Sequence, residues 1–222
     1  MRRRNFLAAG LASAVAACSR AQDATPGSAP QISATAPGPA APPAPPPLPD
    51  TVDISLKTDK GEIVVRLEAK KAPITVANYL RYVDAGKMTG AAFWRAADAG
   101  ASGFIQATAK GATFPPIAHE PTSQTGLSHT SGAISMSRFA PGTATADFVI
   151  CVGDNTFLDA GREGSDDKLG YAAFGHVVKG MDVVRKILHG KIDKHTPAGG
   201  WKGQMLATPV VIESASRVAP PA

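Results

Sequence analysis

Residues 52–67, VDISLKTDKGEIVVRL, carry the pattern that decides the fold. In each half of this stretch every second residue is apolar: Val52, Ile54 and Leu56, then Ile63, Val65 and Leu67. Alternation with a period of two predicts strands with one buried face, and the Asp59-Lys60-Gly61 segment between them predicts a tight turn. The stretch therefore predicts a pair of half-buried antiparallel strands.

The chain that follows continues this β-rich pattern around two helices. Residues 72–83 place apolar side chains on one helical face, with Pro73 in the first turn and Gly86 as a stop signal. Residues 181–188 form a second amphipathic helix. Short apolar runs bounded by glycine-rich breaks predict further strands near 104–106, 132–136, 148–152, 171–178 and 209–214. Many short strands without a βαβ rhythm predict a closed antiparallel β structure with helical caps.

The first 17 residues, MRRRNFLAAGLASAVAA, have the layout of an export signal. A basic start precedes an apolar stretch, residues 6–17, that is too short to form a membrane-spanning helix. Arg3-Arg4-Asn5-Phe6-Leu7 resembles the twin-arginine export motif. Val15-Ala16-Ala17-Cys18 resembles a bacterial lipobox, which makes Cys18 the predicted lipidation site. The alternative is an ordinary secretory signal followed by a chance cysteine.

These segments predict where the protein resides and how it is organised. A lipidated Cys18 anchors the chain in a membrane of the bacterial cell envelope, facing the periplasm, and Ser19 rather than aspartate after it favours the outer membrane. Residues 18–50 are rich in alanine and proline and predict a disordered tether. We expect one folded domain over residues 51–218 and a disordered tail over residues 219–222.

Charge and motifs exclude several classes of function. The formal net charge is +5, but removal of the signal sequence with its three arginines leaves 20 basic and 18 acidic residues and no long basic run. We therefore expect no nucleic-acid partner. The sequence lacks G-x-S-x-G, a Gly-rich phosphate loop, C-x-x-C and H-E-x-x-H, and its five histidines are scattered. We expect no metal and no cofactor, and Cys151 lies in an apolar run typical of a buried thiol.

Five sequence blocks resemble those of the cyclophilin family and occur in the family's order. They are Phe93-Trp94-Arg95 with Gly103-Phe104-Ile105-Gln106, GAISMSR at 132–138, GTATADFVI at 142–150, Phe157-Leu158-Asp159, and FGHVVKGMDVV at 174–184. One block would be weak evidence, whereas five in order are specific. The resemblance implies a mainly β fold, a cyclophilin-like closed eight-stranded antiparallel β-barrel capped by two α-helices, with a substrate groove on its outer face.

The resemblance also implies peptidyl-prolyl cis-trans isomerase activity. Rotation about a peptide bond faces a barrier of about 18–20 kcal/mol, and in the twisted state the prolyl nitrogen regains a lone pair to which a guanidinium can donate. The resemblance assigns this role to Arg95, with Gln106 holding a substrate carbonyl. The implied substrate-binding residues are Phe93, Phe104, Met136, Asp147, Val149, Phe157, Leu158 and Tyr171. For the apolar members of this set, ordinary core packing is the alternative.

The region between the two catalytic candidates departs from the family pattern. Three extra residues separate Arg95 from Gln106, which predicts an intervening loop, residues 96–103, of different shape. Gly103 stands where an aromatic residue is usual, and Tyr171 stands where many relatives have histidine.

The groove floor departs from the pattern as well. Val149 in place of phenylalanine predicts a wider, shallower floor. Asp147 in place of glutamine adds an acceptor-only side chain, expected to pair with Arg95 or Arg138. Phe157 in place of tryptophan predicts weaker binding of the cyclic peptide drug cyclosporin.

The retained arginine and glutamine predict an active isomerase. Its expected partners are proline-containing polypeptide segments of unfolded or exported proteins, whose folding it assists, and we expect a monomer. One alternative is a catalytically weak or silent peptide-binding chaperone module that uses the same groove. Another is a structural envelope lipoprotein whose barrel only scaffolds other proteins.

Overall fold

The structure, a computed structural model, describes residues 48–195 and 201–218. The predicted signal sequence, the lipidation site Cys18, the tail at 219–222 and all but the last three residues of the tether lie outside this described part. Those assignments stay predictions. Within the described ranges, no helix is both long and apolar enough to span a bilayer.

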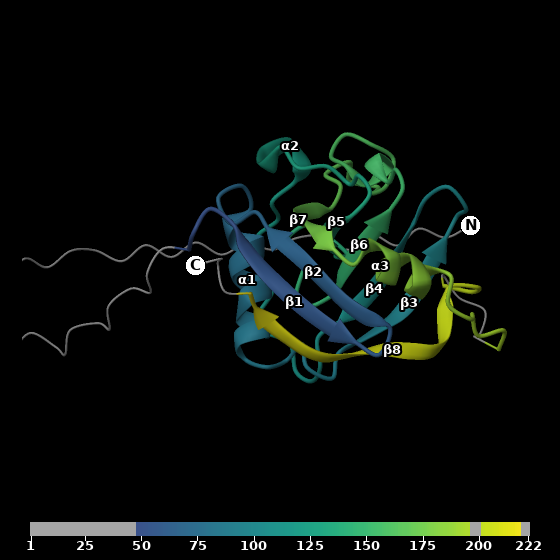
Figure 1. The fold of residues 1–222 in the computed structure, drawn as a ribbon. Helices are drawn as coiled ribbons and strands as arrows, with labels where there is room; N and C mark the ends of the chain where they lie inside the picture. The colour runs from purple at the N-terminus through teal and green to yellow at the C-terminus, as the bar shows by residue number, and fades with distance from the viewer. Residues whose placement is uncertain (1–47, 196–200, 219–222) are drawn as a thin grey trace, which may run out of the picture. The chain divides into compact units, whose positions relative to one another are not determined.

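Eight antiparallel strands close into a barrel (Figure 1). They are β1 Val52–Thr58, β2 Gly61–Leu67, β3 Ala92–Asp98, β4 Gly103–Thr108, β5 Ala133–Met136, β6 Phe148–Val152, β7 Ala172–Lys179 and β8 Met205–Arg217. Around the barrel the order is β1-β2-β7-β5-β6-β4-β3-β8, so each strand is hydrogen-bonded to a neighbour on both sides. The predicted eight-stranded antiparallel barrel is confirmed.

The β1–β2 hairpin follows the alternation seen in the sequence. Val52 pairs with Leu67 at its open end and Thr58 pairs with Gly61 at the turn. The apolar residues between these ends are fully buried: Ile54, Leu56, Ile63 and Val65. Gly61 has a φ of +134°, and a Cβ atom there would lie 2.7 Å from Cγ2 of Val183. The turn therefore requires glycine both for its backbone conformation and for its packing.

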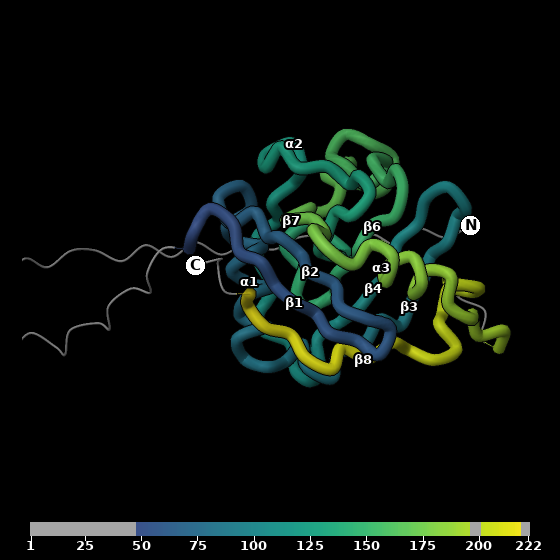
Figure 2. Tube along the Cα trace, viewed as in Figure 1, coloured from purple at the N-terminus to yellow at the C-terminus, as the bar shows by residue number. Residues whose placement is uncertain are grey.

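Two main helices pack against the barrel: α1 Pro73–Asp84 and α3 Met181–Leu188. In Figures 1 and 2 they lie near opposite ends of β1 and β2. Both helices were expected from their periodicity. The single-turn helix α2 Thr122–Thr125 and the 3₁₀ turn η1 Thr156–Leu158 were not expected, since elements this short carry no helical period.

A buried carboxylate completes the start of α1. Glu120 is 1% exposed and accepts hydrogen bonds from the backbone N–H groups of Ile74 (3.1 Å) and Thr75 (2.7 Å). The Thr75 hydroxyl donates to the same carboxylate at 2.7 Å. These bonds satisfy N–H groups that have no partner within the helix and place a negative charge at its positive end.

Side chains fill the inside of the barrel. The Tyr79 ring from α1 lies 5.3 Å from the rings of both Phe148 and Phe174, measured between centroids. Phe93 packs edge to face against Phe148 at 5.9 Å. The interior is a packed core, as expected for an eight-stranded barrel, so a peptide has to bind on the outside.

A β-bulge in β3 directs Arg95 out of the barrel. Phe93 pairs with Ala107 and Arg95 pairs with Gln106, so Trp94 is an extra residue opposite a single step of β4. Without the bulge, Phe93 and Arg95 would point to the same face, because side chains alternate along a strand. Instead the Phe93 ring is fully buried in the core, while Arg95 lies half-buried on the outer face.

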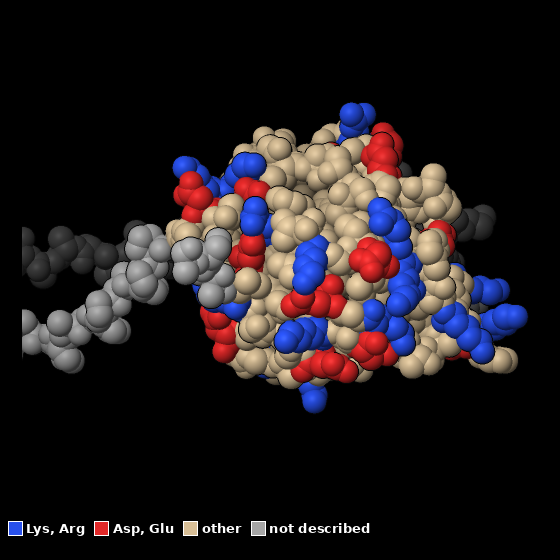
Figure 3. Space-filling model, in the orientation of Figure 1, with Lys and Arg blue, Asp and Glu red and all other residues tan. Residues whose placement is uncertain are grey.

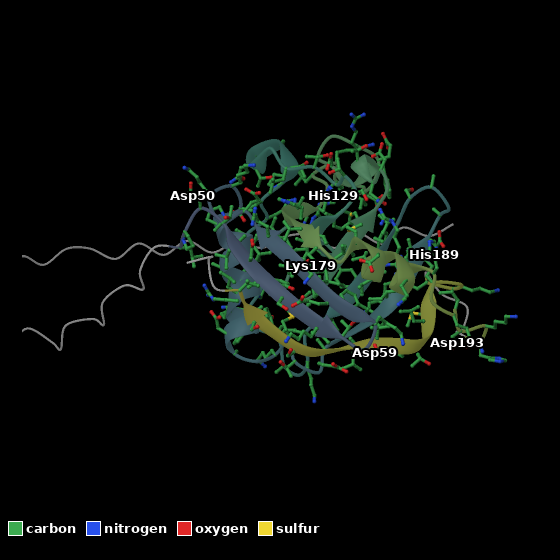
Figure 4. All side chains as sticks on the ribbon, viewed as in Figure 1. Asp50, Asp59, His129, Lys179, His189 and Asp193 are labelled. Carbon is green, nitrogen blue, oxygen red and sulfur yellow. The ribbon has the colours of Figure 1, made fainter. Side chains whose placement is uncertain are left out.

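Residues 96–103 form the end of the β3–β4 hairpin. Ala96 pairs with Ile105 and Asp98 pairs with Gly103, and a short turn at 99–102 closes the hairpin. The prediction of a loop over 96–103 is therefore wrong, because both strands continue with ordinary ladder pairing. His189, at the end of α3 (labelled in Figure 4), lies 2.9 Å from the Asp98 carboxylate and supports the hairpin end.

Charges of both signs alternate on the face shown in Figure 3. Arg66 on β2 makes a bidentate ion pair with Asp53 on β1 at 2.8 Å. Lys179 on β7, labelled in Figure 4, pairs with Glu62 on β2 at 2.9 Å. These pairs join neighbouring strands, and exposed pairs of this kind contribute little to stability.

Candidate active site

A groove of about 530 Å³ crosses the outer surface of β3, β4, β6 and β5. Nine of the ten residues predicted to catalyse or bind substrate line it: Arg95, Phe104, Gln106, Met136, Asp147, Val149, Phe157, Leu158 and Tyr171. Phe93 does not line the groove. Its assignment as a substrate-binding residue is corrected by the bulge at Trp94, which leaves the Phe93 ring inside the barrel.

A small apolar cluster outside the main core supplies two residues of the groove floor. Val149 on β6 and the partly buried Phe104 ring line the groove and pack with Cys151 on β6 and Ala133 on β5. Burial raises the pKa of the Cys151 thiol to about 12, so it stays neutral and packs as a small apolar residue. A compact apolar floor of this kind suits the ring of a proline side chain.

Neutral and aromatic groups surround Arg95. Its Nη1 group donates to Oε1 of Gln106 at 2.9 Å, and its Nε group donates to Oε1 of Gln204 at 2.8 Å. Its Cζ atom lies 5.0 Å from the Phe104 ring centroid and 5.5 Å from that of Trp201. Among the described residues, no carboxylate forms an ion pair with it. Partial burial lowers the pKa of Arg95, yet a guanidinium remains charged at neutral pH.

Gln106 interacts with both Arg95 and Asp147. Its amide oxygen accepts from Arg95. Desolvation by burial raises the pKa of Asp147, although interactions with the side chains of Thr108 and Gln106 oppose the shift. The expectation that Asp147 forms an ion pair with Arg95 or Arg138 is wrong, because it interacts with neutral Gln106 and Thr108 instead.

Arg138, which follows β5 in the chain, lines the other side of the groove. Its side chain is 1% exposed and makes a bidentate ion pair with Asp167 at 2.7 and 2.9 Å. It also donates to the carbonyl oxygen of Gly170 at 3.0 Å, and its Cζ atom lies 5.4 Å from the Tyr171 ring. Every edge of this guanidinium has a protein partner, so it supports the wall on which Tyr171 stands.

A buried polar network lies behind the groove. The imidazole of His129, labelled in Figure 4, is fully buried, with Nδ1 2.6 Å from Asp159 and Nε2 2.8 Å from the Ser135 hydroxyl. The order of groups resembles a hydrolytic triad, but Ser135 is 0% exposed and cannot meet a substrate. The network joins β5 to η1, and so fixes the distance between Met136 and Leu158 across the groove.

Trp94, Phe139 and Trp201 line the groove without a role predicted from the sequence, and Gln204 contacts Arg95 beside it. Trp94 stands inside a recognised block, and Phe139, at 91% exposure, directly follows another. Nothing near Trp201 or Gln204 in the sequence indicates a site. They reach Arg95 because β8 pairs with β3 over more than 100 residues of intervening chain, with Met205 opposite Arg95.

Comparison with known proteins matches residues 51–216 to the family described as cyclophilin type peptidyl-prolyl cis-trans isomerase/CLD. The chain belongs to this family. It is a cyclophilin-type peptidyl-prolyl cis-trans isomerase, and the isomerase class predicted from the sequence is confirmed. The match covers both main helices and all eight strands except the last residue of β8.

Curated and solved cyclophilins resemble this chain over most of their own length. Peptidyl-prolyl cis-trans isomerase A of Dickeya dadantii is 36% identical over 166 residues, which cover 73% of this chain and 82% of that protein. Peptidyl-prolyl cis-trans isomerase B of Escherichia coli is 39% identical over 138 residues, covering 60% and 82%. A cyclophilin of Cryptosporidium parvum superposes with a TM-score of 0.62 at 16% identity, covering 77% of this chain and 99% of that one.

Within the described residues, no group of three or more histidine, cysteine or acidic side chains is arranged to hold a metal ion. Burial lowers the pKa of His129, so its neutral ring suits the hydrogen-bonded network described above.

Proposed function

We propose that this cyclophilin isomerises X–Pro bonds of exported or envelope proteins, with Arg95 and Gln106 as its catalytic residues. The observation that carries the catalytic assignment is an arginine that has no carboxylate partner in the described part of the chain and lies beside an apolar groove floor. Arg95 then donates to the prolyl nitrogen of the substrate, and the proline ring packs on the groove floor.

Arg95 lowers the barrier by binding the twisted state more strongly than the planar one. In the planar amide the nitrogen lone pair is delocalised, and it becomes available only as the C–N bond rotates. A guanidinium N–H aimed at this nitrogen therefore forms a hydrogen bond that exists mainly in the transition state, which raises kcat rather than ground-state affinity. No covalent bond is made or broken.

Gln106 holds one side of the rotating bond. Its oxygen accepts from Arg95, which leaves its amide NH₂ group as the donor for a substrate carbonyl. Fixing that carbonyl while the proline ring rests on Phe104, Met136 and Val149 leaves rotation of the X–Pro bond as the remaining freedom.

A related solved structure supports peptide binding by this fold. The Cryptosporidium parvum cyclophilin has been solved in the presence of the dipeptide Ala-Pro, and its TM-score to this chain is 0.60 at 16% identity. We propose that the groove of this chain takes proline-containing segments in the same way, as a monomer. Refolding of an exported protein limited by X–Pro isomerisation tests this: the full chain should accelerate the slow phase in proportion to its concentration, and an unchanged slow phase would contradict the proposal.

We further propose that Cys18 anchors the protein to the periplasmic side of a bacterial envelope membrane, with the outer membrane favoured. The support is the export-like segment 1–17 and the lipobox-like Val15-Ala16-Ala17-Cys18. Cells labelled with radioactive palmitate should yield a labelled protein in the outer-membrane fraction. A Cys18→Ala variant should lose the label and the membrane association. A soluble, unlabelled wild-type protein would contradict the anchor.

A further inference from the structure

The short segment 201–205, which ends at the first residue of β8, contacts the guanidinium of Arg95. Gln204 accepts from Nε of Arg95 at 2.8 Å, and the Trp201 ring lies 5.5 Å from its Cζ atom. A second indole, that of Trp94, meets Trp201 edge to face with centroids 5.7 Å apart. Both Trp201 and Trp94 also line the groove.

The backbone places this segment independently of its side chains. The backbone N–H of Ala96 donates to the carbonyl oxygen of Gln204 at 2.8 Å, and Arg95 pairs with Met205 across the β3–β8 ladder. The Gln204 N–H donates to the carbonyl oxygen of Trp201 at 3.0 Å, which closes a turn. Substitution of the Gln204 side chain therefore leaves the segment's backbone contacts intact.

A count of hydrogen-bond donors shows what this arrangement leaves for a substrate. A guanidinium has five N–H donors in a fixed plane. Gln204 takes the Nε donor and Gln106 takes one Nη1 donor. The remaining Nη1 hydrogen and both Nη2 hydrogens have no acceptor among the described residues. The rings of Phe104 and Trp201 further limit how the plane can turn.

We propose that Gln204 and Trp201 are positioning residues that hold the Arg95 guanidinium in its catalytic orientation without neutralising its charge. This inference rests on the proposed role of Arg95. A carboxylate at residue 204 would fix the same Nε–H but would offset the charge that the prolyl nitrogen needs. A neutral amide oxygen and the face of an indole fix the orientation and leave the free Nη donors charged.

Gln204→Ala is the first test. It removes the acceptor of Nε, and kcat should fall about tenfold with KM changed by less than about twofold, because the lost bond acts on the transition state through Arg95. The ¹⁵Nε–H signal of Arg95 in NMR should exchange with water faster in the variant. Gln124→Ala, which removes an exposed glutamine on α2, is the matched control and should leave both readouts as in the wild type.

Trp201 is tested by two substitutions. Trp201→Ala removes the ring beside the guanidinium and should lower kcat about threefold, as expected for a partly exposed cation–π contact. Trp201→Phe keeps a ring and should recover most of that loss. Equal kcat values for the alanine and phenylalanine variants would contradict a role for the ring.

The outcomes separate this inference from the proposed function. If Arg95→Ala retains wild-type turnover, the role of Arg95 itself fails, and the inference fails with it. If Arg95→Ala is inactive but Gln204→Ala keeps both its kcat and its Nε–H signal, only the positioning role is overturned. A raised KM at unchanged kcat in Gln204→Ala would also overturn it, since that result would mean direct contact with substrate.

Discussion

Two arginines stand on opposite sides of the groove, and their surroundings differ in kind. Arg138 is buried, bound on two nitrogens by Asp167 and capped by the Gly170 carbonyl. Arg95 is bound by two neutral amide oxygens, from Gln106 and Gln204, and its other three N–H donors have no acceptor within residues 48–195 and 201–218. One guanidinium is fully occupied by the protein, while the other is oriented but chemically available.

The comparison shows how a protein can use the same side chain for structure and for catalysis. An ion pair stabilises Arg138 and leaves it nothing to offer a substrate. Amide acceptors and aromatic rings orient Arg95 while its positive charge remains uncompensated, which is what stabilisation of a developing lone pair requires. The following predictions test this division of roles.

Arg95→Lys should show the largest of these effects. Lysine keeps the charge, but its single ammonium cannot bond Gln106 and Gln204 and also reach the prolyl nitrogen in one plane. We expect kcat/KM for an X–Pro peptide to fall about 100-fold, with the melting temperature near that of the wild type. Near-normal turnover would mean that charge alone, without the planar guanidinium, is sufficient.

Arg138→Ala should act on stability more than on turnover. It leaves Asp167 and the Gly170 carbonyl without their charged donor, and loss of charge-assisted bonds should lower the melting temperature by about 4 °C. Scanning calorimetry measures the shift. A folded variant with as little turnover as Arg95→Lys would reverse the roles given to the two arginines.

The Arg138–Asp167 pair also predicts a dependence of stability on pH. Hydrogen bonds from Arg138 hold the pKa of Asp167 well below its ordinary value of 3.8. As the pH falls through 3.8, Asp167 takes up a proton in the unfolded chain before it does so in the folded one. The contribution of the ion pair to the free energy of unfolding is therefore complete at neutral pH and declines as the pH falls further. Urea unfolding should therefore show a stability gap between wild type and Arg138→Ala that narrows below about pH 4. A gap that widens in acid would contradict the pairing.

Asp147→Asn should give the smallest effect on stability, and it should raise the free energy of unfolding, whereas Arg138→Ala lowers it. Burial raises the pKa of Asp147, so the folded state holds this proton more tightly than the unfolded one and loses stability as the pH rises above 3.8. The asparagine amide does not ionise, so the variant avoids the cost of a buried charge at residue 147. It should be slightly more stable than the wild type at pH 7 but not in acid. Lower stability at pH 7 would indicate that the carboxylate is needed as an acceptor for Gln106 and Thr108.

Most of the barrel could be predicted because its signals are local. Alternation in 52–67 defined the first hairpin, and the predicted helix at 181–188 coincides with α3. The bulge at Trp94 could not be predicted, because it arises from the pairing of β3 with two neighbouring strands and leaves no mark on the periodicity. The family resemblance assigns Phe93 to the substrate-binding set, although its ring belongs to the core.

The site could be predicted on one side and not on the other. Gln106, Met136 and Val149 lie in recognisable blocks, whereas Trp201 and Gln204 reach Arg95 only through the long-range β3–β8 pairing. Sequence blocks also gave no way to distinguish a free arginine from a paired one. The partner of Arg138 is Asp167, 29 residues further along the chain and outside every recognised block.

The catalytic role of Arg95 is tested most directly by the rate of cis-trans exchange of an X–Pro peptide, measured by NMR with the full chain and its Arg95→Ala variant. The wild type should accelerate exchange clearly, and the variant should lose at least about 100-fold of that rate while it retains the fold. Wild-type acceleration that survives in a folded Arg95→Ala variant would contradict the assignment of Arg95 as the catalytic residue.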